Sequence, residues 1–200
     1  AYGRIEDVPR EVYERVVDTA VHGTANLARV VLPVFREQGA GHLAVVNSLL
    51  GNIATPLMGA YVTAKWGQLG LVRSLQLETR DESGISISII QPGGVNTPIY
   101  SQAASWAGST GRPPPPAYSP FRVARRVVST LDRPRRVVQA GVLNHVVTAG
   151  FRLLPGVYDT LVGPLLQQLA LAGDDAPPTT GNVLESKPDG NATEGPWRSI

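Results

Sequence analysis

Two short stretches, Ser48-Leu49-Leu50-Gly51 and Tyr61-Val62-Thr63-Ala64-Lys65, decide how the whole chain is interpreted. Ser48 follows an apolar run that is typical of a buried strand, and the second stretch is expected to lie in a helix. Helical residues four positions apart share one face, so we expect the Tyr61 phenol and the Lys65 ammonium to stack there. An ammonium lowers the pKa of a neighbouring phenol from about 10, and a serine hydroxyl can hold a carbonyl or alcohol oxygen. The pattern therefore predicts proton transfer at Tyr61, with Ser48 facing it.

A second apolar run and the loop after it strengthen this interpretation. Strands are predicted over His42–Asn47 and over Ile85–Ile90. The second strand leads into Gln91-Pro92-Gly93-Gly94-Val95-Asn96-Thr97-Pro98. A serine, then Tyr-x-x-x-Lys, then Pro-Gly-x-x-x-Thr, in this order, resembles the short-chain dehydrogenase/reductase family. The resemblance covers about residues 1–141.

The resemblance implies a fold, a cofactor and a reaction. The fold would be α/β, a Rossmann-like doubly wound parallel sheet. The reaction would be hydride transfer between NAD(P)(H) and a carbonyl or secondary alcohol substrate. By resemblance, Ser48 orients the substrate oxygen, Tyr61 is the acid or base, and Lys65 lowers the pKa of Tyr61. Tyr61 and Lys65 would also contact the cofactor, with Lys65 on the nicotinamide ribose.

The family pattern also assigns residues to the nicotinamide and to the substrate. Pro92, Gly93, Val95 and Thr97 match the segment beside the nicotinamide, where the Val95 backbone and the Thr97 hydroxyl would contact its carboxamide. Residues 96–117 lack periodicity and are rich in proline, so we expect an irregular segment that covers the substrate. The aromatic residues expected to line an apolar pocket there, or else to be exposed, are Tyr100, Trp106 and Tyr118.

One position departs from the family pattern. The family's helix before the serine strand commonly carries an asparagine three residues before a glycine, and that asparagine serves a proton relay. Here the position holds Ala20, three residues before Gly23. Alanine has no hydrogen-bonding side chain, so the water chain that would resupply Lys65 with protons loses its usual anchor.

The glycine-rich turn that holds a dinucleotide's pyrophosphate does not occur in this sequence. The family writes it Thr-Gly-x-x-x-Gly-x-Gly, between its first strand and its first helix. We therefore expect a chain truncated at the N-terminal half of the fold, with weak cofactor binding and an unpaired edge at the strand His42–Asn47. The alternative is a non-catalytic fragment that acts as an oligomerisation or interaction module.

Long helices are predicted on both sides of the first strand. Apolar residues recur at helical spacing over 9–38 and again over 59–83. In the family these helices pack against a second subunit, so the resemblance implies a homodimer or homotetramer; periodicity alone shows only that an apolar face is buried. A further helix is predicted over 119–132 and a third strand over 135–140.

Residues 142–172 are predicted to form an amphipathic helical extension. Pro155 and Pro164 are expected to divide it into short helices, and together with its charged residues they exclude a membrane span. Packing on the domain or on a partner is favoured over a lid or a membrane-surface segment. The tail, 173–200, is rich in Pro, Gly, Asp and Thr and is expected to be largely disordered.

Composition restricts the function further. The formal charge of +2 is small and the arginines are scattered, which argues against binding to nucleic acid. Cysteine is absent and His22, His42 and His145 lie far apart, so we expect structural or surface histidines and no metal site. No basic-then-apolar signal segment occurs, and a cytoplasmic location is the simpler expectation. The expected partner is a small-molecule carbonyl or alcohol.

Overall fold

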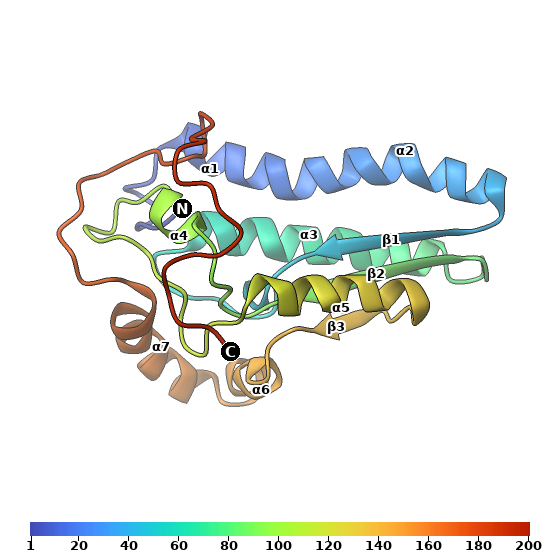
Figure 1. Ribbon diagram of the computed structural model, residues 1–200. Coiled ribbons are helices and arrows are strands. Elements are labelled where there is room, and N and C mark those ends of the chain that lie inside the picture. Colours follow the sequence, from blue (N-terminus) through green and yellow to red (C-terminus); the bar gives the residue numbers. More distant parts are fainter.

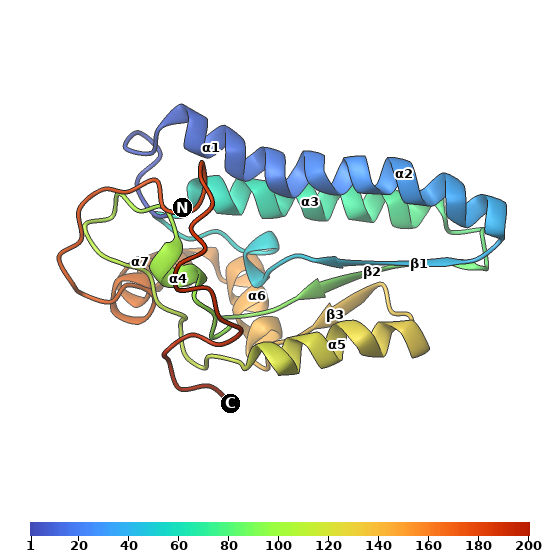
Figure 2. The same ribbon diagram turned by 45° about the horizontal axis from the view of Figure 1, so that its top comes forward.

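The computed structural model describes residues 1–200 as three layers, with a sheet between helices. The sheet is parallel and its strands, in spatial order, are β1 (Gly41–Val46), β2 (Ile85–Gln91) and β3 (Val137–Gln139). The helices that cover it are α2 (Gly23–Gln38), α3 (Gly59–Glu78) and α5 (Pro120–Asp132). Helices α2 and α3 cover one face, and α5 covers the other (Figures 1 and 2). This is the α/β, Rossmann-like arrangement that the sequence predicts.

The sheet is built on the two long strands. β1 and β2 pair in parallel from Gly41 opposite Ile85 to Val46 opposite Ile90. Parallel strands are usually covered on both faces, and β2 accordingly has its isoleucines buried. β3 is shorter than the predicted strand over 135–140. β1 lies at the edge of the sheet, as expected from the sequence.

The helix predicted over residues 9–38 is continuous but not uniform. α1 (Arg10–Val17) passes through a π-helical turn, Asp18–His22, into α2. The π-helical turn, which the sequence did not predict, shifts the backbone hydrogen bonds from i→i+4 to i→i+5. Pro33 lies inside α2 without ending it; Gly39 ends it with φ of 69°, a left-handed conformation that costs glycine little.

The main core lies between the helix pair and the sheet. Its nine buried residues are all aliphatic: Ala28, Leu32, Leu43, Val45, Val72, Leu75, Ile85, Ile87 and Ile89. The alternation of side chains along a strand sends Ile85, Ile87 and Ile89 to the same face, under α2 and α3. The core therefore fixes α3, which carries the predicted catalytic pair, against one face of the sheet.

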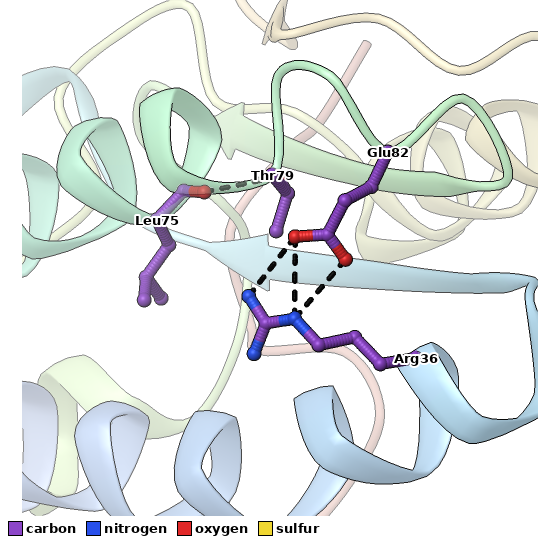
Figure 3. Close-up of polar contacts among 4 residues, drawn as sticks. All are labelled: Arg36, Leu75, Thr79 and Glu82. Atoms are coloured by element: carbon purple, nitrogen blue, oxygen red, sulfur yellow. Dashed lines mark hydrogen bonds and ion pairs between the residues drawn. The ribbon is translucent and has the colours of Figure 1, made fainter.

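A surface ion pair joins the end of α2 to the loop after α3. Arg36 donates from Nε to both carboxylate oxygens of Glu82, at 3.2 and 3.1 Å, and from a terminal nitrogen at 3.1 Å (Figure 3). Beside it, the buried Thr79 hydroxyl donates to the Leu75 carbonyl at 2.9 Å and closes the last turn of α3. The two helices are thus tied together at the end of the molecule opposite the predicted site.

The other face of the sheet is joined to α5 by a histidine. His42 on β1 contacts the Ser86 hydroxyl on β2 through Nδ1 at 2.6 Å, and the Thr130 hydroxyl on α5 through Nε2 at 2.9 Å. Burial lowers the pKa of His42. Its role is structural, as the sequence indicated.

The remaining chain gathers at the carboxyl end of the sheet. A short helix α4 (Ile99–Gln102) lies in the irregular segment, and α6 (Asn144–Leu153) and α7 (Pro155–Ala170) form the extension. Pro155 starts α7 as predicted, but Pro164 lies inside α7, so its expected role as a divider is wrong. Residues 173–200, expected to be largely disordered, contain no helix or strand and yet follow a defined path, with Ile200 hydrogen-bonded to Ala117 at 3.0 Å. None of the helices is long and apolar enough to cross a membrane.

Candidate active site

Ser48 lies just beyond the carboxyl end of β1. Backbone hydrogen bonds from Asn47 to the Ile90 carbonyl and from Leu49 to the Pro92 carbonyl, both 2.8 Å, hold this segment to the end of β2. The Ser48 hydroxyl oxygen accepts from the Leu50 amide at 3.1 Å and caps a short 3-10 turn. Ligands of open parallel sheets bind at this edge, so Ser48 stands where a substrate is expected.

Helix α3 places Tyr61 and Lys65 on one face, as their spacing predicted. The Lys65 ammonium lies 5.8 Å from the centre of the Tyr61 ring. Burial raises the pKa of Tyr61 above its ordinary value, and hydrogen bonding with the Ser48 side chain acts in the opposite direction. We expected Lys65 to lower this pKa. Loss of water around the phenol has the larger effect and Ser48, not Lys65, supplies the opposing one, so the pKa stays raised and Tyr61 is protonated at neutral pH.

Two acceptors hold the Lys65 ammonium. Its Nζ donates to the Val46 carbonyl at 3.2 Å and to Gln68 Oε1 at 3.1 Å. Burial lowers the pKa of Lys65 to about 8. The ammonium is therefore charged at pH 7 but loses its proton at a lower pH than an exposed lysine does.

Gln68 is a site residue that the sequence interpretation missed. It is buried, and its Oε1 accepts from Lys65 and from Asn47 Nδ2 at 2.9 Å. Its Nε2 donates to the Thr24 hydroxyl at 2.9 Å and to the Ala20 carbonyl at 3.3 Å. The available signal was its place on α3, where a polar amide shares a face with the buried Ala64 and with Val72 and Leu75 of the core.

This amide joins the lysine to the helix that lacks the expected asparagine. The Ala20 carbonyl belongs to the π-helical turn and also accepts from the Thr24 hydroxyl at 2.7 Å. One side chain, Gln68, thus spans from Lys65 to the position where the family pattern places its relay. We refer to Lys65, Gln68, Thr24 and Ala20 as the amide link.

The predicted cofactor segment, 92–97, lies beside these residues. Gly93 lines a cavity together with Ser48 and Tyr61, and Gly94 does the same. Pro92, Val95 and Thr97 are not among the lining residues of that cavity. Backbone pairing between this segment and Tyr118 fixes it, since the Tyr118 amide donates to the Gly94 carbonyl at 2.8 Å and the Asn96 amide to the Tyr118 carbonyl at 2.9 Å.

The three aromatic residues expected near the substrate separate into two groups. Tyr100 and Tyr118 line the cavity. Burial raises the pKa of Tyr100 to about 12. The prediction for Trp106 is wrong, because it packs against the separate apolar cluster of Val8, Val12 and Ala104. Side-chain packing around the amino-terminal residues therefore removes Trp106 from the site.

The cavity occupies about 520 Å³, within the usual range for small-molecule sites. Its 31 lining residues include 22 hydrophobic ones. Ser48 and Tyr61 line one side of it, while α6 and α7 supply much of the apolar wall. The arrangement can place an oxygen of a small molecule at Tyr61 and keep the rest of that molecule among aliphatic side chains.

Aromatic contacts attach the extension to α3 and to the loop before it. Phe151 of α6 packs edge-on against Trp66 of α3 and Tyr158 of α7, with ring centres 6.1 and 5.1 Å apart. The Tyr158 hydroxyl donates to the Ala54 carbonyl at 2.7 Å, and Trp66 Nε1 donates to the Ile53 carbonyl at 3.0 Å. The extension is thus fastened to the loop between Ser48 and Tyr61.

Comparison with known proteins agrees with this geometry. A family model described as short chain dehydrogenase matches residues 2–108. D-beta-hydroxybutyrate dehydrogenase of Rhizobium meliloti (strain 1021) is 28% identical over 178 residues, which cover 89% of this chain and 58% of that protein. Oxidoreductase BOA17 of Botryotinia fuckeliana (strain B05.10) is 34% identical over 110 residues, 55% of this chain and 37% of that protein. The chain spans about half the length of the curated relatives that it matches.

Solved structures share the fold. A short chain dehydrogenase from Burkholderia cenocepacia J2315 in complex with NADP aligns with a TM-score of 0.66 at 19% identity, over 80% of this chain and 63% of that one. A short-chain dehydrogenase from Streptomyces avermitilis aligns with a TM-score of 0.63 at 22% identity, over 80% and 62%. At such identities the likeness concerns the fold alone.

Proposed function

Because the chain belongs to the short-chain dehydrogenase family, we propose that it carries the catalytic residues of an oxidoreductase that interconverts a carbonyl compound and a secondary alcohol with NAD(P)(H). The observation that carries this proposal is the convergence of Ser48 and Tyr61 on one cavity, with the Lys65 ammonium 5.8 Å from the Tyr61 ring. The activity and substrates of any longer protein that contains this chain are part of the proposal.

The proton chemistry follows from the state of Tyr61. A raised pKa leaves the phenol protonated at neutral pH, so Tyr61 is ready to act as an acid. In reduction, the carbonyl oxygen becomes an alkoxide and takes this proton. The Ser48 hydroxyl, which hydrogen-bonds with Tyr61, would turn its proton to the same oxygen and orient it once the substrate is bound. Lys65 stabilises the phenolate that remains.

The residues present fit the nicotinamide end of the cofactor. Gly93 and Gly94 put bare backbone on the cavity wall beside Tyr61. A Cβ on Gly94 would lie 2.7 Å from the Pro114 carbonyl oxygen, and one on Gly93 would lie 3.2 Å from Asn144 Oδ1. NAD(P)H would supply the hydride.

We assign Pro92, Gly93, Val95 and Thr97 to the nicotinamide, together with Tyr61 and Lys65. Tyr100 is assigned to the substrate with Ser48 and Tyr61, because all three line the cavity. The pyrophosphate-binding turn expected of the family does not occur in the sequence, so weak binding of the dinucleotide is expected from these residues alone.

Titration with NADH and NADPH, followed by nicotinamide fluorescence, is the first test. In a form of the protein that binds either cofactor, Tyr61→Phe is expected to lower carbonyl reduction about 100-fold or more, because it removes the acid. Tyr13→Phe, on α1 and outside the cavity, is the matched control and keeps its activity. Unchanged turnover in Tyr61→Phe would refute the assignment.

An association module is the second candidate function. The helical stripe Leu27, Val30 and Val34 of α2 is exposed, and Val30 is 68% exposed. Such a stripe suits contact with another helix pair, so we propose that α2 and α3 pair with a second copy of the chain. Light scattering of Val30→Asp checks this: a lower mass than the native chain is expected, and an unchanged mass contradicts it. Absence of cofactor binding by the folded chain would favour this function over catalysis.

A further inference from the structure

The cavity wall carries no charged side chain: none of its 31 lining residues is Asp, Glu, Lys, Arg or His. Charged residues make up 17% of the chain, so about five would be expected among 31. We propose that the substrate of this site is an uncharged, largely apolar carbonyl or alcohol, and that α6 and α7 bind its hydrocarbon body. This inference rests on the proposed oxidoreductase function.

Burial keeps four tyrosine hydroxyls that face the cavity neutral at pH 7. Burial raises the pKa of Tyr2 and of Tyr61, and raises the pKa values of Tyr100 and Tyr158 to about 12. A charged substrate group would therefore enter without a partner of opposite charge, which is strongly unfavourable.

Part of the apolar wall is still exposed to solvent. Leu154, Val157, Leu161 and Leu165 line the cavity, yet each remains at least 46% exposed to solvent. A hydrocarbon chain lying on them would remove apolar surface of both molecules from water. Because Ser48 and Tyr61 line the same cavity, the oxygen of such a molecule would meet the acid while its chain covers α7. The substrate is thus the occupant that explains both the apolar wall and the polar end.

The extension is suited to this role by its attachment. The ring contacts of Phe151 and the hydrogen bond from Tyr158 to Ala54 fasten it to the loop that follows Ser48. Helix α7 would therefore select the length of the substrate, while Ser48 and Tyr61 would bind its reacting oxygen. A second copy of the chain or a lipid surface could also cover exposed leucines, and these are the competing outcomes of the test.

The test is calorimetric titration of the folded chain with 2-alkanones of increasing length, which requires no cofactor. Affinity is expected to rise about fourfold for each added methylene until the cavity is filled. A methyl ketone of the same length that ends in a carboxylate is expected to bind about 100-fold more weakly. Affinity that ignores chain length, or that favours the carboxylate, would overturn the proposal.

Matched variants locate the binding. Leu161→Asp and Val157→Asp, both half-exposed on α7, are expected to weaken binding of the longest ketone about tenfold or more, whereas Leu131→Asp on α5, outside the cavity, leaves it unchanged. Circular dichroism verifies the fold of each variant. Equal effects of all three variants would show that ketone binding does not depend on α7 and would overturn the proposal. Unchanged ketone binding, together with a changed molecular mass of the protein or a changed sedimentation with phosphatidylcholine vesicles, would assign α7 to a second copy or to lipid and would also overturn it.

Failure of this proposal differs from failure of the proposed function. Ketone binding that follows length, without NAD(P)H oxidation in a cofactor-binding form, would leave the pocket assignment standing and refute the reaction. Reduction of only short or carboxylated carbonyl compounds would support the reaction and refute the pocket assignment.

Discussion

Replacing Gln68 by leucine is expected to lower the pKa of Lys65. The change removes the Oε1 acceptor that lies 3.1 Å from Nζ, while the Val46 carbonyl at 3.2 Å remains. A hydrogen bond to a charged group contributes about 1.5–3 kcal/mol, so its loss corresponds to about one to two pKa units. The ammonium, whose pKa is already lowered to about 8 by burial, would then be partly neutral at pH 7.

The assay is NMR titration of the chain labelled at lysine. Only two lysines are present, so Lys187 in the tail provides an internal reference for Lys65. Gln68→Glu places a carboxylate beside the ammonium and is expected to raise the pKa of Lys65, opposite to the effect of Gln68→Leu. Gln167→Leu, exposed on α7, is the matched control. A Lys65 titration that is the same in native chain and Gln68→Leu would refute the amide link as the support of this lysine.

The same substitution tests the connection to the first helical run. Without Gln68, the Ala20 carbonyl keeps its bond from Thr24, and Asn47 keeps its bond to the Lys65 carbonyl at 2.9 Å. Because each partner retains one hydrogen bond, the free energy of unfolding is expected to fall by only about 1–3 kcal/mol. A larger loss in urea denaturation would indicate that Gln68 mainly supports the packing of α3.

Three further predictions concern charge and pH. Burial lowers the pKa of Lys65 to about 8 in the folded chain, while the unfolded chain keeps the ordinary pKa of 10.5, so unfolding takes up a proton between these pH values and stability rises with pH. Relative to Lys65→Met, the native chain should gain about 2 kcal/mol of unfolding free energy from pH 7 to 10 in urea denaturation, and a constant difference would contradict this. Burial lowers the pKa of His42, so the stability that depends on the neutral imidazole is complete above pH 6.5 and is lost as the pH falls. The His42→Gln variant should therefore lose less thermal stability on acidification than the native chain, whereas a His145→Gln variant, changed at an exposed position, should lose as much. Equal acid sensitivity of the native chain and both variants would exclude His42 as the cause. Glu82→Gln breaks the ion pair with Arg36, in which the Arg36 and Glu82 side chains are 46% and 31% exposed. It should lower the free energy of unfolding by about 0.5 kcal/mol at low salt and by almost nothing in 1 M NaCl, and a loss that salt does not change would mean that the pair acts through packing.

The residues of the candidate site differ in how far apart they lie in the sequence. Ser48, Tyr61 and Lys65 lie within a strand end and one helix, so their chemistry is visible in local spacing. The contacts around them join distant parts of the chain: Gln68 and Ala20 are 48 positions apart, and Tyr158 and Ala54 are 104 apart. Contacts of this kind depend on how helices pack, and no local pattern specifies them.

By itself, the sequence determined the parallel strands, the helices and the face of α3 that carries Tyr61 and Lys65, because side-chain periodicity is a property of each element alone. It also indicated the loop from Pro92 to Thr97. Only the tertiary structure decided that the pKa of Tyr61 is raised and that Gln68 accepts a hydrogen bond from Lys65. The packing of α6 and α7 around the cavity was likewise decided by the tertiary structure. Desolvation, long-range hydrogen bonds and cavity walls are set by which elements are packed together, so they exist only once the chain has folded.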